Sequence, residues 1–140
     1  MEFKVVETLD ELIKTFIVRG IVFMEEQGVR YTIEKDSQEH SALHLIGEID
    51  QEPVAAARIR FQGDCAKLER MAVRPQWRGQ GYGRQLLDFT MATARGQGFK
   101  KFKLHAQITA QAFYEKQGFK PVGDIFKEAD IEHRLMVSED

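Results

Sequence analysis

The segment Arg78-Gly79-Gln80-Gly81-Tyr82-Gly83-Arg84 carries the strongest structural signal in this sequence. It follows a stretch with strand character, 66–73, and precedes a helical face at 86–94. Glycines let backbone amides approach a ligand closely, and the amides at the start of a helix are unpaired and partly positive. The segment therefore predicts a strand, a phosphate-binding loop and a helix, with the two arginines as additional charges. The alternative is an ordinary tight turn and helix cap.

Two better-known phosphate loops do not fit this segment. A Walker loop needs Gly-Lys followed by Ser or Thr, whereas Gly83 is followed by Arg84. A dinucleotide-binding loop needs its third glycine where Arg84 stands. It also needs an acidic residue about 20 positions onward, where Lys103 and His105 are found. The sequence excludes both patterns.

The segments on either side alternate between helix and strand patterns. Thr8 and Glu11 match a capping box, and the helix that follows shows one apolar face to about residue 24. That face consists of Leu9, Leu12, Ile13, Phe16, Ile17, Ile21 and Met24. Residues 25–40 are polar and irregular. Strands are predicted at 3–7, 42–49, 54–61, 66–73, 102–106, 119–125 and 132–137, and further helices at 86–94 and 109–117.

This order of elements predicts a mixed α+β fold. The strand, helix and strand between residues 66 and 106 form a crossover. A crossover of this kind requires at least one parallel pair of strands. The expected sheet is therefore mixed.

Length and composition exclude several classes of protein. The 140 residues, 43% of them hydrophobic, are typical of one domain, 1–140, with a real core. No apolar run reaches the roughly 18 residues of a membrane span, and the N-terminus lacks the apolar core of a signal peptide. Cys65 is the single cysteine, so no internal disulfide and no cysteine cluster for a metal is expected. We expect a cytoplasmic protein without a bound metal.

The net charge of −2 hides an uneven distribution. Residues 58–103 carry +8, between flanks of −7 in residues 1–57 and −3 in residues 104–140. This pattern indicates a local anion site, unless the charges cluster by chance. The basic segment lacks the interleaved aromatic residues of a nucleic-acid-binding surface, so no nucleic acid is expected as a partner.

Two motifs follow one another between residues 66 and 119. Leu68-Glu69-Arg70-Met71-Ala72-Val73-Arg74-Pro75 precedes Arg78-x-x-Gly81-x-Gly83, and Ala110-x-x-Phe113-Tyr114-x-x-x-Gly118-Phe119 comes later. In this order and spacing they resemble the acetyl-CoA-binding motif and the later motif of the GNAT superfamily of N-acetyltransferases. Upstream, Val22-Phe23-Met24-Glu25-Glu26-Gln27-Gly28-Val29 is similar to the YjcF and ElaA-like branch. The resemblance covers nearly the whole chain.

The resemblance implies a central mixed, mostly antiparallel sheet flanked by helices. In it, the strand 66–73 splays from the strand around Leu104, and the pantetheine arm of acetyl-CoA lies in the gap. Backbone groups of Met71 and Val73 would pair with the pantetheine amides, as an added strand does. Backbone amides of the glycine segment would hold the pyrophosphate. The residues expected to bind this acyl donor are Met71, Ala72, Val73, Arg78, Gly79, Gln80, Gly81, Tyr82, Gly83, Arg84, Gln107 and Phe113.

The resemblance also suggests how the leaving group is protonated. Tyr114 stands where the superfamily places the tyrosine that protonates the departing CoA thiolate, and a phenol can act as a general acid. The alternative is that Tyr114, like Phe113, only packs the short helix against the sheet. Gln107 stands where many relatives carry an asparagine, so its contact with cofactor or substrate is an open point.

An amine acceptor also requires a base, because alkylammonium groups are mostly protonated at neutral pH. Glu69 is the expected base: it matches the acidic residue of some relatives and lies in step with Lys67 and Met71 on one strand face. One alternative is a salt bridge from Glu69 to a basic neighbour such as Arg58 or Arg70. The others are a base role for His105, for His44 or for water.

The expected function is transfer of an acetyl group from acetyl-CoA to a primary amine, by direct attack in a ternary complex. A covalent route through Cys65 is disfavoured, since no histidine partner is evident. The competing function is a non-catalytic acyl-CoA-binding module that senses the cofactor or binds a partner.

The acceptor, a small molecule or a peptide, would lie against residues 19–44. Their side chains form either an acidic surface for a cation or a solvated loop, and include Glu25, Glu26, Tyr31, Glu34 and Asp36. No membrane partner is expected, and a homodimer is compatible with the resemblance.

Overall fold

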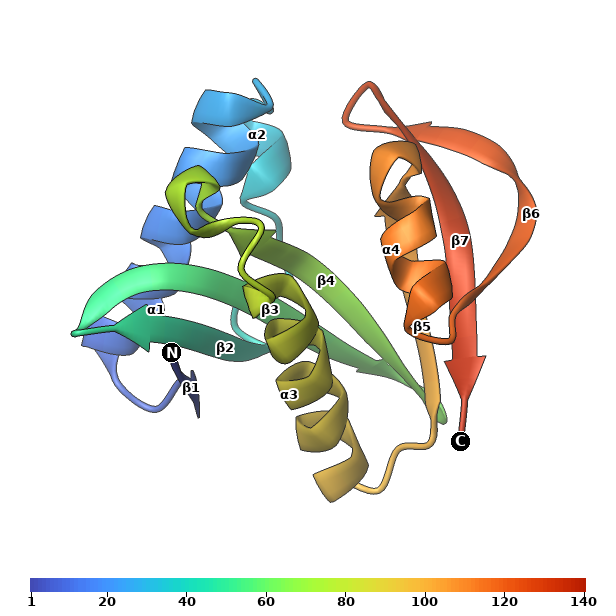
Figure 1. Cartoon of the computed structure of the whole chain (residues 1–140), viewed down its shortest axis with the longest axis horizontal. Helices are drawn as coiled ribbons and strands as arrows, with labels where there is room; N and C mark the ends of the chain where they lie inside the picture. Colours follow the sequence, from blue (N-terminus) through green and yellow to red (C-terminus); the bar gives the residue numbers. More distant parts are fainter.

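A seven-stranded sheet forms the centre of the computed structural model, which describes residues 1–140 (Figure 1). The strands are β1 (Glu2–Val5), β2 (Leu43–Ile49), β3 (Glu52–Gln62), β4 (Cys65–Val73), β5 (Lys101–Gln107), β6 (Lys120–Glu128) and β7 (Ile131–Glu139). The α-helices are α1 (Leu9–Arg19), α2 (Tyr31–Glu34), α3 (Tyr82–Gly96) and α4 (Gln111–Lys116). A π-helix, η1 (Gly20–Glu26), extends α1, and single 3₁₀ turns are η2 (Pro75–Trp77) and η3 (Ile108–Ala110).

The strand order β1-β2-β3-β4-β5-β7-β6 confirms the mixed sheet expected from the sequence. Every neighbouring pair is antiparallel except β4 and β5, which are parallel. Short turns join β2 to β3, β3 to β4 and β6 to β7, while α3 makes the crossover between the parallel strands β4 and β5. No helix combines the length and the apolar character that a membrane span requires.

Both faces of the sheet are covered, because successive side chains of a strand point to opposite faces. Leu45 and Ala57 belong to the main core, which also contains the buried side chains of α3. Ile46 and Ala56 belong to a smaller cluster with Val18 of α1. Helices α3 and α1 therefore pack against opposite faces.

The parallel pair β4–β5 is very short. Only residues 65–67 of β4 pair with residues 101–103 of β5. Beyond them, β4 continues beside β3 and β5 continues beside β7, so the two strands diverge toward their carboxyl ends (Figure 1). The splay implied by the resemblance is present.

A β-bulge alters the faces of β4. Its register with β3 shifts between Ala56 and Arg58, and Arg70 has φ of 51°. The extra residue places Met71 against the main core, whereas Glu69 meets Arg58 on the other face. The expectation that Glu69 and Met71 share a face is therefore wrong, because it assumed regular alternation.

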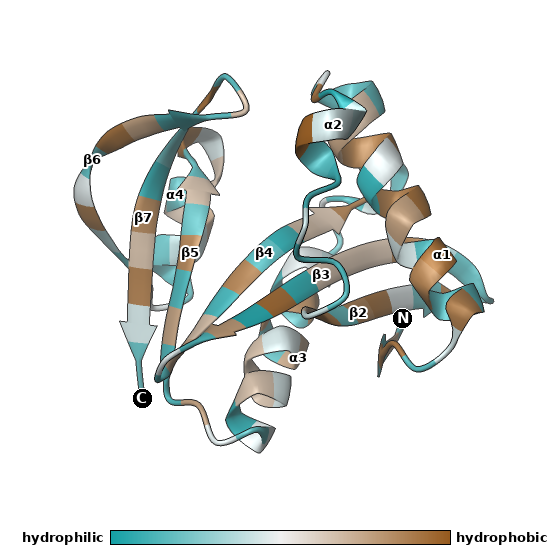
Figure 2. Ribbon diagram, turned by 180° about the vertical axis from the view of Figure 1, so that it is seen from behind, coloured by the Kyte–Doolittle hydropathy of each residue, from teal (hydrophilic) through white to brown (hydrophobic).

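Helix α1 begins with the expected capping box but turns much of its apolar stripe outward. Leu9 is 73% and Ile13 47% exposed, and Phe16 and Ile17 are exposed as well. Figure 2 shows hydrophobic bands along α1. The inner face is occupied instead by Thr15, Val18 and Arg19. An arginine can lie there because carboxylates from residues 34–39 neutralise it.

The capping box makes a testable contribution to stability. The Thr8 hydroxyl accepts a hydrogen bond from the Glu11 amide, and the Glu11 carboxylate accepts one from the Thr8 amide. Thr8→Ala removes the first bond and should lower the free energy of unfolding by about 1 kcal/mol. Urea titration measures this loss. Thr109→Ala is the control, since Thr109 is exposed and outside any cap; an equal loss in both variants would contradict the assignment.

Candidate functional site

A cleft of about 800 Å³ lies where β4 and β5 diverge. Its walls come from η1, β4, the loop before α3, β5, α4 and the turn between β6 and β7. The cleft brings together all of the expected site residues except Gln80 and Tyr82. Those that line it are Glu69, Met71, Ala72, Val73, Arg78, Gly79, Gly81, Gly83, Arg84, Gln107, Phe113 and Tyr114.

The glycine loop forms one end of this cleft. Gly79 and Gly81 have φ values of 77° and 86°, a conformation that glycine adopts without strain. No side chain caps the start of α3, and the N–H groups of its first turn have no acceptor within the helix. A Cβ atom at either glycine would meet no other atom, so the loop surface is open. These amides suit an anion such as a phosphate.

The two arginines that flank the loop differ in their environment. Arg84 is exposed in the first turn of α3, and the closest carboxylate oxygen, of Asp88, is 3.9 Å away. Arg78 is held by Glu26 through two bonds of 2.6 Å and donates to the carbonyl of Val73 at 2.8 Å. Arg84 is therefore the side chain more available to an anion, and Arg78 ties η1 to the loop.

Tyr114 of α4 lines the cleft opposite Met71 of β4. Its hydroxyl is 3.9 Å from the sulfur of Met71, and its ring packs against Phe113 and Phe119. Burial raises the pKa of Tyr114 to about 12. The phenol is therefore protonated at neutral pH and available as a hydrogen-bond donor. Phe113 lies close to Gly83, and its ring belongs to the packing around the main core.

Gln107 and Gln27 meet between β5 and the residue that follows η1. The Gln107 amide donates to the Gln27 carbonyl oxygen at 2.8 Å. Both side chains line the cleft. Together with the pair Glu26–Arg78, this contact fixes residues 26 and 27 to two walls of the cleft. The sequence offered no signal for Gln27 beyond the resemblance of its segment.

The carboxylate of Glu69 is paired with three cationic side chains. Its carboxylate accepts hydrogen bonds from Arg58 and Arg60, and the Lys67 ammonium is 3.1 Å away. Burial alone would raise the pKa of Glu69, but the hydrogen bonds from Arg60 and the charges of Arg58 and Lys67 lower it to about 2. A carboxylate of that pKa is a weak base. The salt-bridge alternative is thus realised, with Arg60 and Lys67 as partners in addition to Arg58, and it weighs against Glu69 as the base.

A buried ion cluster continues from Glu69 toward α1. We use this name for Arg19, Glu34, Asp36, Glu39, Arg58, Glu69 and their partners Arg60, Lys67 and Arg70. Arg58 makes two bonds of 2.8 Å to Asp36, and the side chains of both Arg19 and Arg58 are only 1% exposed.

The ion cluster changes the expected acceptor surface. Glu34 and Asp36 are bound by arginines, and Glu26 is bound by Arg78. Only Glu25 among the four expected carboxylates has no ion pair and is exposed. Residues 19–44 therefore do not present a free acidic surface to a cation.

Two other candidates lie outside the cleft. His44 is buried beside Phe16, its ring nitrogen Nε2 donates to the carbonyl of Glu39, and burial lowers its pKa. Cys65 begins β4, where it pairs with Lys101, and burial raises the pKa of its thiol. Neither lines the cleft, so neither a base role for His44 nor an acetyl-cysteine has support.

His105 does line the cleft, and it has a partner that the sequence did not reveal. Its Nδ1 is 2.8 Å from Oε2 of Glu128, at the end of β6. The two residues are brought together by the pairing of β5 with β7 and of β7 with β6. Because this register is non-local, no motif in the sequence could have pointed to Glu128.

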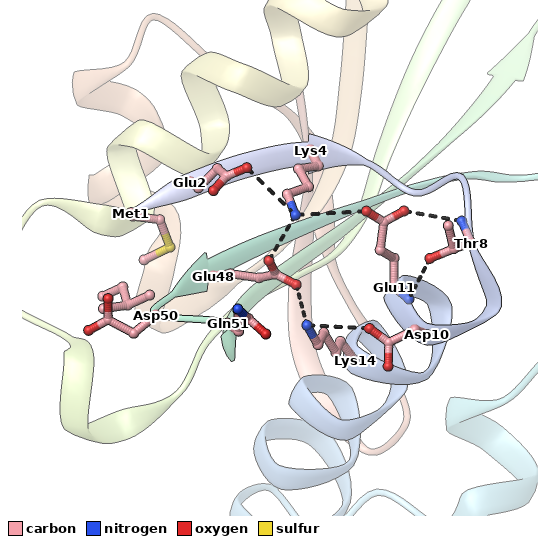
Figure 3. A pocket seen from close by; sticks show the side chains of 11 residues that line it. Met1, Glu2, Lys4, Thr8, Asp10, Glu11, Lys14, Glu48, Asp50 and Gln51 are labelled. Carbon is pink, nitrogen blue, oxygen red and sulfur yellow. Dashed lines mark hydrogen bonds and ion pairs between the residues drawn. The ribbon is translucent and has the colours of Figure 1, made fainter.

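A second hollow, of about 750 Å³, lies between β1, the start of α1 and the end of β2 (Figure 3). Lys14 and Lys4 both point to the buried carboxylate of Glu48, at 2.7 and 3.1 Å. Lys14 also meets Asp10, and Lys4 meets Glu11. Since these lysines are neutralised and none of the expected site residues lies there, the cleft is the candidate site.

The fold and the cleft together define a class of protein. One cleft joins a loop with unpaired amides, the gap between two diverging strands and a half-buried phenol. The family model described as "Acetyltransferase (GNAT) domain" matches residues 11–139. The chain belongs to this GNAT family of acetyltransferases.

Individual relatives agree with this assignment. The chain is 31% identical to the "Uncharacterized N-acetyltransferase YjcF" of Bacillus subtilis (strain 168), over 99% of this chain and 100% of that protein. It is 31% identical to "Protein ElaA" of Escherichia coli (strain K12), over 94% and 90%. A crystal structure of an acyl-CoA N-acyltransferase from Pseudomonas aeruginosa superposes with a TM-score of 0.88, at 27% identity and 97% coverage of both chains. The resemblance to the YjcF and ElaA-like branch is confirmed.

The ion cluster predicts a loss of stability in acid. The pKa of Glu69 is about 2 in the folded chain, against an ordinary value of 4.5, and the pKa of Asp36 is also lowered. These carboxylates contribute fully to stability at a pH above their ordinary pKa values. The contribution is lost as the pH falls from those values toward the lower pKa values of the folded chain. The urea midpoint should therefore fall steeply between about pH 5 and pH 2.

Glu69→Gln isolates the contribution of one carboxylate. The variant should unfold at lower urea at pH 7, and its midpoint should change less between pH 6 and pH 3 than that of the unaltered protein. Glu25→Gln, at an exposed carboxylate without an ion pair, is the control. Identical acid profiles for Glu69→Gln and the unaltered protein would show that the ionised Glu69 does not stabilise the fold.

Proposed function

We propose that the chain transfers an acetyl group from acetyl-CoA to a primary amine, by direct attack within a ternary complex. The observation that carries this proposal is the single cleft that joins the glycine loop, the gap between β4 and β5, and Tyr114. The donor chemistry agrees with the name of the Pseudomonas aeruginosa protein, an acyl-CoA N-acyltransferase. The residues present fit such a donor at both of its ends.

The open edge of β4 suits the pantetheine arm. After Lys67, β4 has no strand partner on the side of β5, so its backbone groups there can pair with amides of a ligand. Met71 and Val73 lie on this part of β4, and the pyrophosphate would then lie on the amides at the start of α3. The exposed Arg84 adds a charge beside it.

Tyr114 is proposed to stabilise the leaving sulfur. Cleavage of the thioester leaves charge on sulfur, and a protonated phenol can donate a hydrogen bond to it and then a proton. Full transfer from a group of pKa about 12 to a thiolate in water is uphill. A thiolate beside Tyr114 would be destabilised by the same loss of solvent that raises the pKa of the phenol, which makes the transfer easier.

Positioning supplies most of the rate. Holding the amine against the thioester carbon can be worth an effective molarity of about 10⁵–10⁸ M, whereas an acid or base adds about 10²–10⁴-fold. Because the cleft holds donor and acceptor together, an enzyme without its general acid should be slow but active.

Release of CoA from acetyl-CoA, measured with a panel of primary amines, amino sugars and peptides, tests the proposal. We expect turnover that depends on both acetyl-CoA and at least one amine. The competing function, a non-catalytic acyl-CoA-binding module, predicts tight binding of acetyl-CoA by calorimetry and no turnover with any acceptor. That result would overturn the catalytic proposal.

Tyr114→Phe separates the two roles of this side chain. The ring is kept, so packing and acetyl-CoA affinity should be unchanged, while kcat should fall about 10²-fold because the donor is lost. Steady-state kinetics and calorimetry measure these two quantities. Phe113→Leu, beside it in α4, is the comparison, and we expect it to affect stability more than kcat. Unchanged kcat in Tyr114→Phe would leave Tyr114 with a packing role alone.

A further inference from the structure

We propose that His105, oriented by Glu128, is the general base that takes a proton from the amine acceptor. This inference rests on the proposed function, because it assigns a role within the same reaction. A base other than Glu69 is needed, because the carboxylate of Glu69 is already paired with Arg58, Arg60 and Lys67.

The position of His105 on β5 places it on the acceptor side of the sheet. Leu104 and Ala106 are buried in the main core, which α3 covers. Since side chains alternate along a strand, His105 points to the opposite face, where it lines the cleft with its side chain 30% exposed. The loop proposed to bind the phosphates is at the start of α3, on the face opposite to His105. An acceptor therefore has room to approach from the face of His105.

The pairing of His105 with Glu128 leaves Nε2 of His105 free to accept a proton. Nδ1 lies 2.8 Å from the carboxylate oxygen of Glu128, so Nδ1 carries the hydrogen and Nε2 carries the lone pair. Nε2 has no hydrogen-bond partner in the chain, while the ring lies edge-on to Phe126 at 5.0 Å. The ring is thus held in place, with its acceptor nitrogen unused.

The surrounding charges support this arrangement. The hydrogen bond from His105 lowers the pKa of Glu128, so its carboxylate is ionised at neutral pH. Lys67 of β4 and His133 of β7 also lie within electrostatic range of Glu128. His133 itself is engaged, because its Nδ1 donates to the carbonyl of Ile131 at 2.7 Å. Glu69 of β4 lines the same cleft, with its charge neutralised by its cations. An ionised Glu128 can stabilise the imidazolium that forms when Nε2 takes a proton.

The proposed step balances. Nε2 of His105 accepts one proton from the ammonium form of the acceptor and later releases it to solvent. The neutral nitrogen forms its bond to the thioester carbonyl carbon, and the bond from that carbon to sulfur breaks. Sulfur receives the phenolic proton of Tyr114, and the second proton of the nitrogen restores the phenol through solvent. The products are the acetamide, free CoA and one proton.

The test uses two acceptors that differ in basicity. One is a simple alkylamine with a pKa near 10, and the other is its fluorinated analogue, which is mostly neutral at pH 7.5. His105→Gln should lower kcat/KM about 10²-fold with the alkylamine and only a few-fold with the analogue, because the analogue does not have to lose a proton to His105 before it attacks. A loss of packing or of acetyl-CoA binding would lower both values equally. His40→Gln, at an exposed histidine outside the cleft, is the matched control.

Glu128→Gln tests whether Glu128 positions His105. It also tests the role of His105 as the base if His105→Gln fails to fold. The acid limb of kcat/KM against pH should move to lower pH, since a neutral amide no longer stabilises the imidazolium. A merely structural Glu128 would leave that limb where it is.

The outcomes are distinguishable. Equal losses with both amines, or no loss, together with an unmoved acid limb, would overturn the role of His105 and leave the proposed function intact. No turnover by the unaltered protein with any amine would overturn the proposed function, and the base assignment with it.

Discussion

The pairing of β4 with β5 ends after three residues, and the rest of the site depends on this early end. A parallel pair that continued would satisfy its own backbone groups and leave no space between the strands. Instead, the carboxyl-terminal part of β4 keeps free backbone donors and acceptors beside a cleft of about 800 Å³. A peptide-like chain is the ligand best suited to such an edge. The bulge at Arg70 contributes, because it turns Met71 toward Tyr114 and Glu69 away from it.

The ion cluster holds the wall of the cleft on the opposite side from β5. It fastens residues 34–39 to β3 and β4 through Arg58, and to α1 through Arg19. Buried charges are costly unless they are paired and hydrogen-bonded, and here each carboxylate has at least one guanidinium partner. The same ion pairs neutralise Glu34 and Asp36, two of the acidic side chains that the sequence suggested for a cationic acceptor. The charges of the ion cluster therefore shape the cleft, and we propose that proton transfer depends on the imidazole of His105, whose Nε2 has no partner in the chain.

Local patterns predicted much of the fold and of the cofactor end of the site. The capping box of Thr8 and Glu11, the strand and loop at 66–83 and the short helix with Tyr114 all have signals within a few residues, and all are present. Features that depend on register were not predictable. The bulge at Arg70 puts the residues that follow it on the opposite face from the one that regular alternation predicts. The partner of His105, Glu128, is brought to it by two strand pairings. The stripe of α1 was misjudged because Arg19, a charged residue, takes an inner position that a hydrophobic pattern assigns to apolar side chains.

Acetyl-CoA is proposed to lie across the gap between β4 and β5, and a crystal structure of the protein with CoA would locate it. We expect the pyrophosphate on the backbone amides of Gly79 to Gly83, and the pantetheine arm between the strands beside the backbone of Met71 and Val73. The sulfur of CoA should point to Tyr114. CoA bound elsewhere, for instance in the hollow around Glu48, with the gap between β4 and β5 closed, would show that the proposed site is wrong.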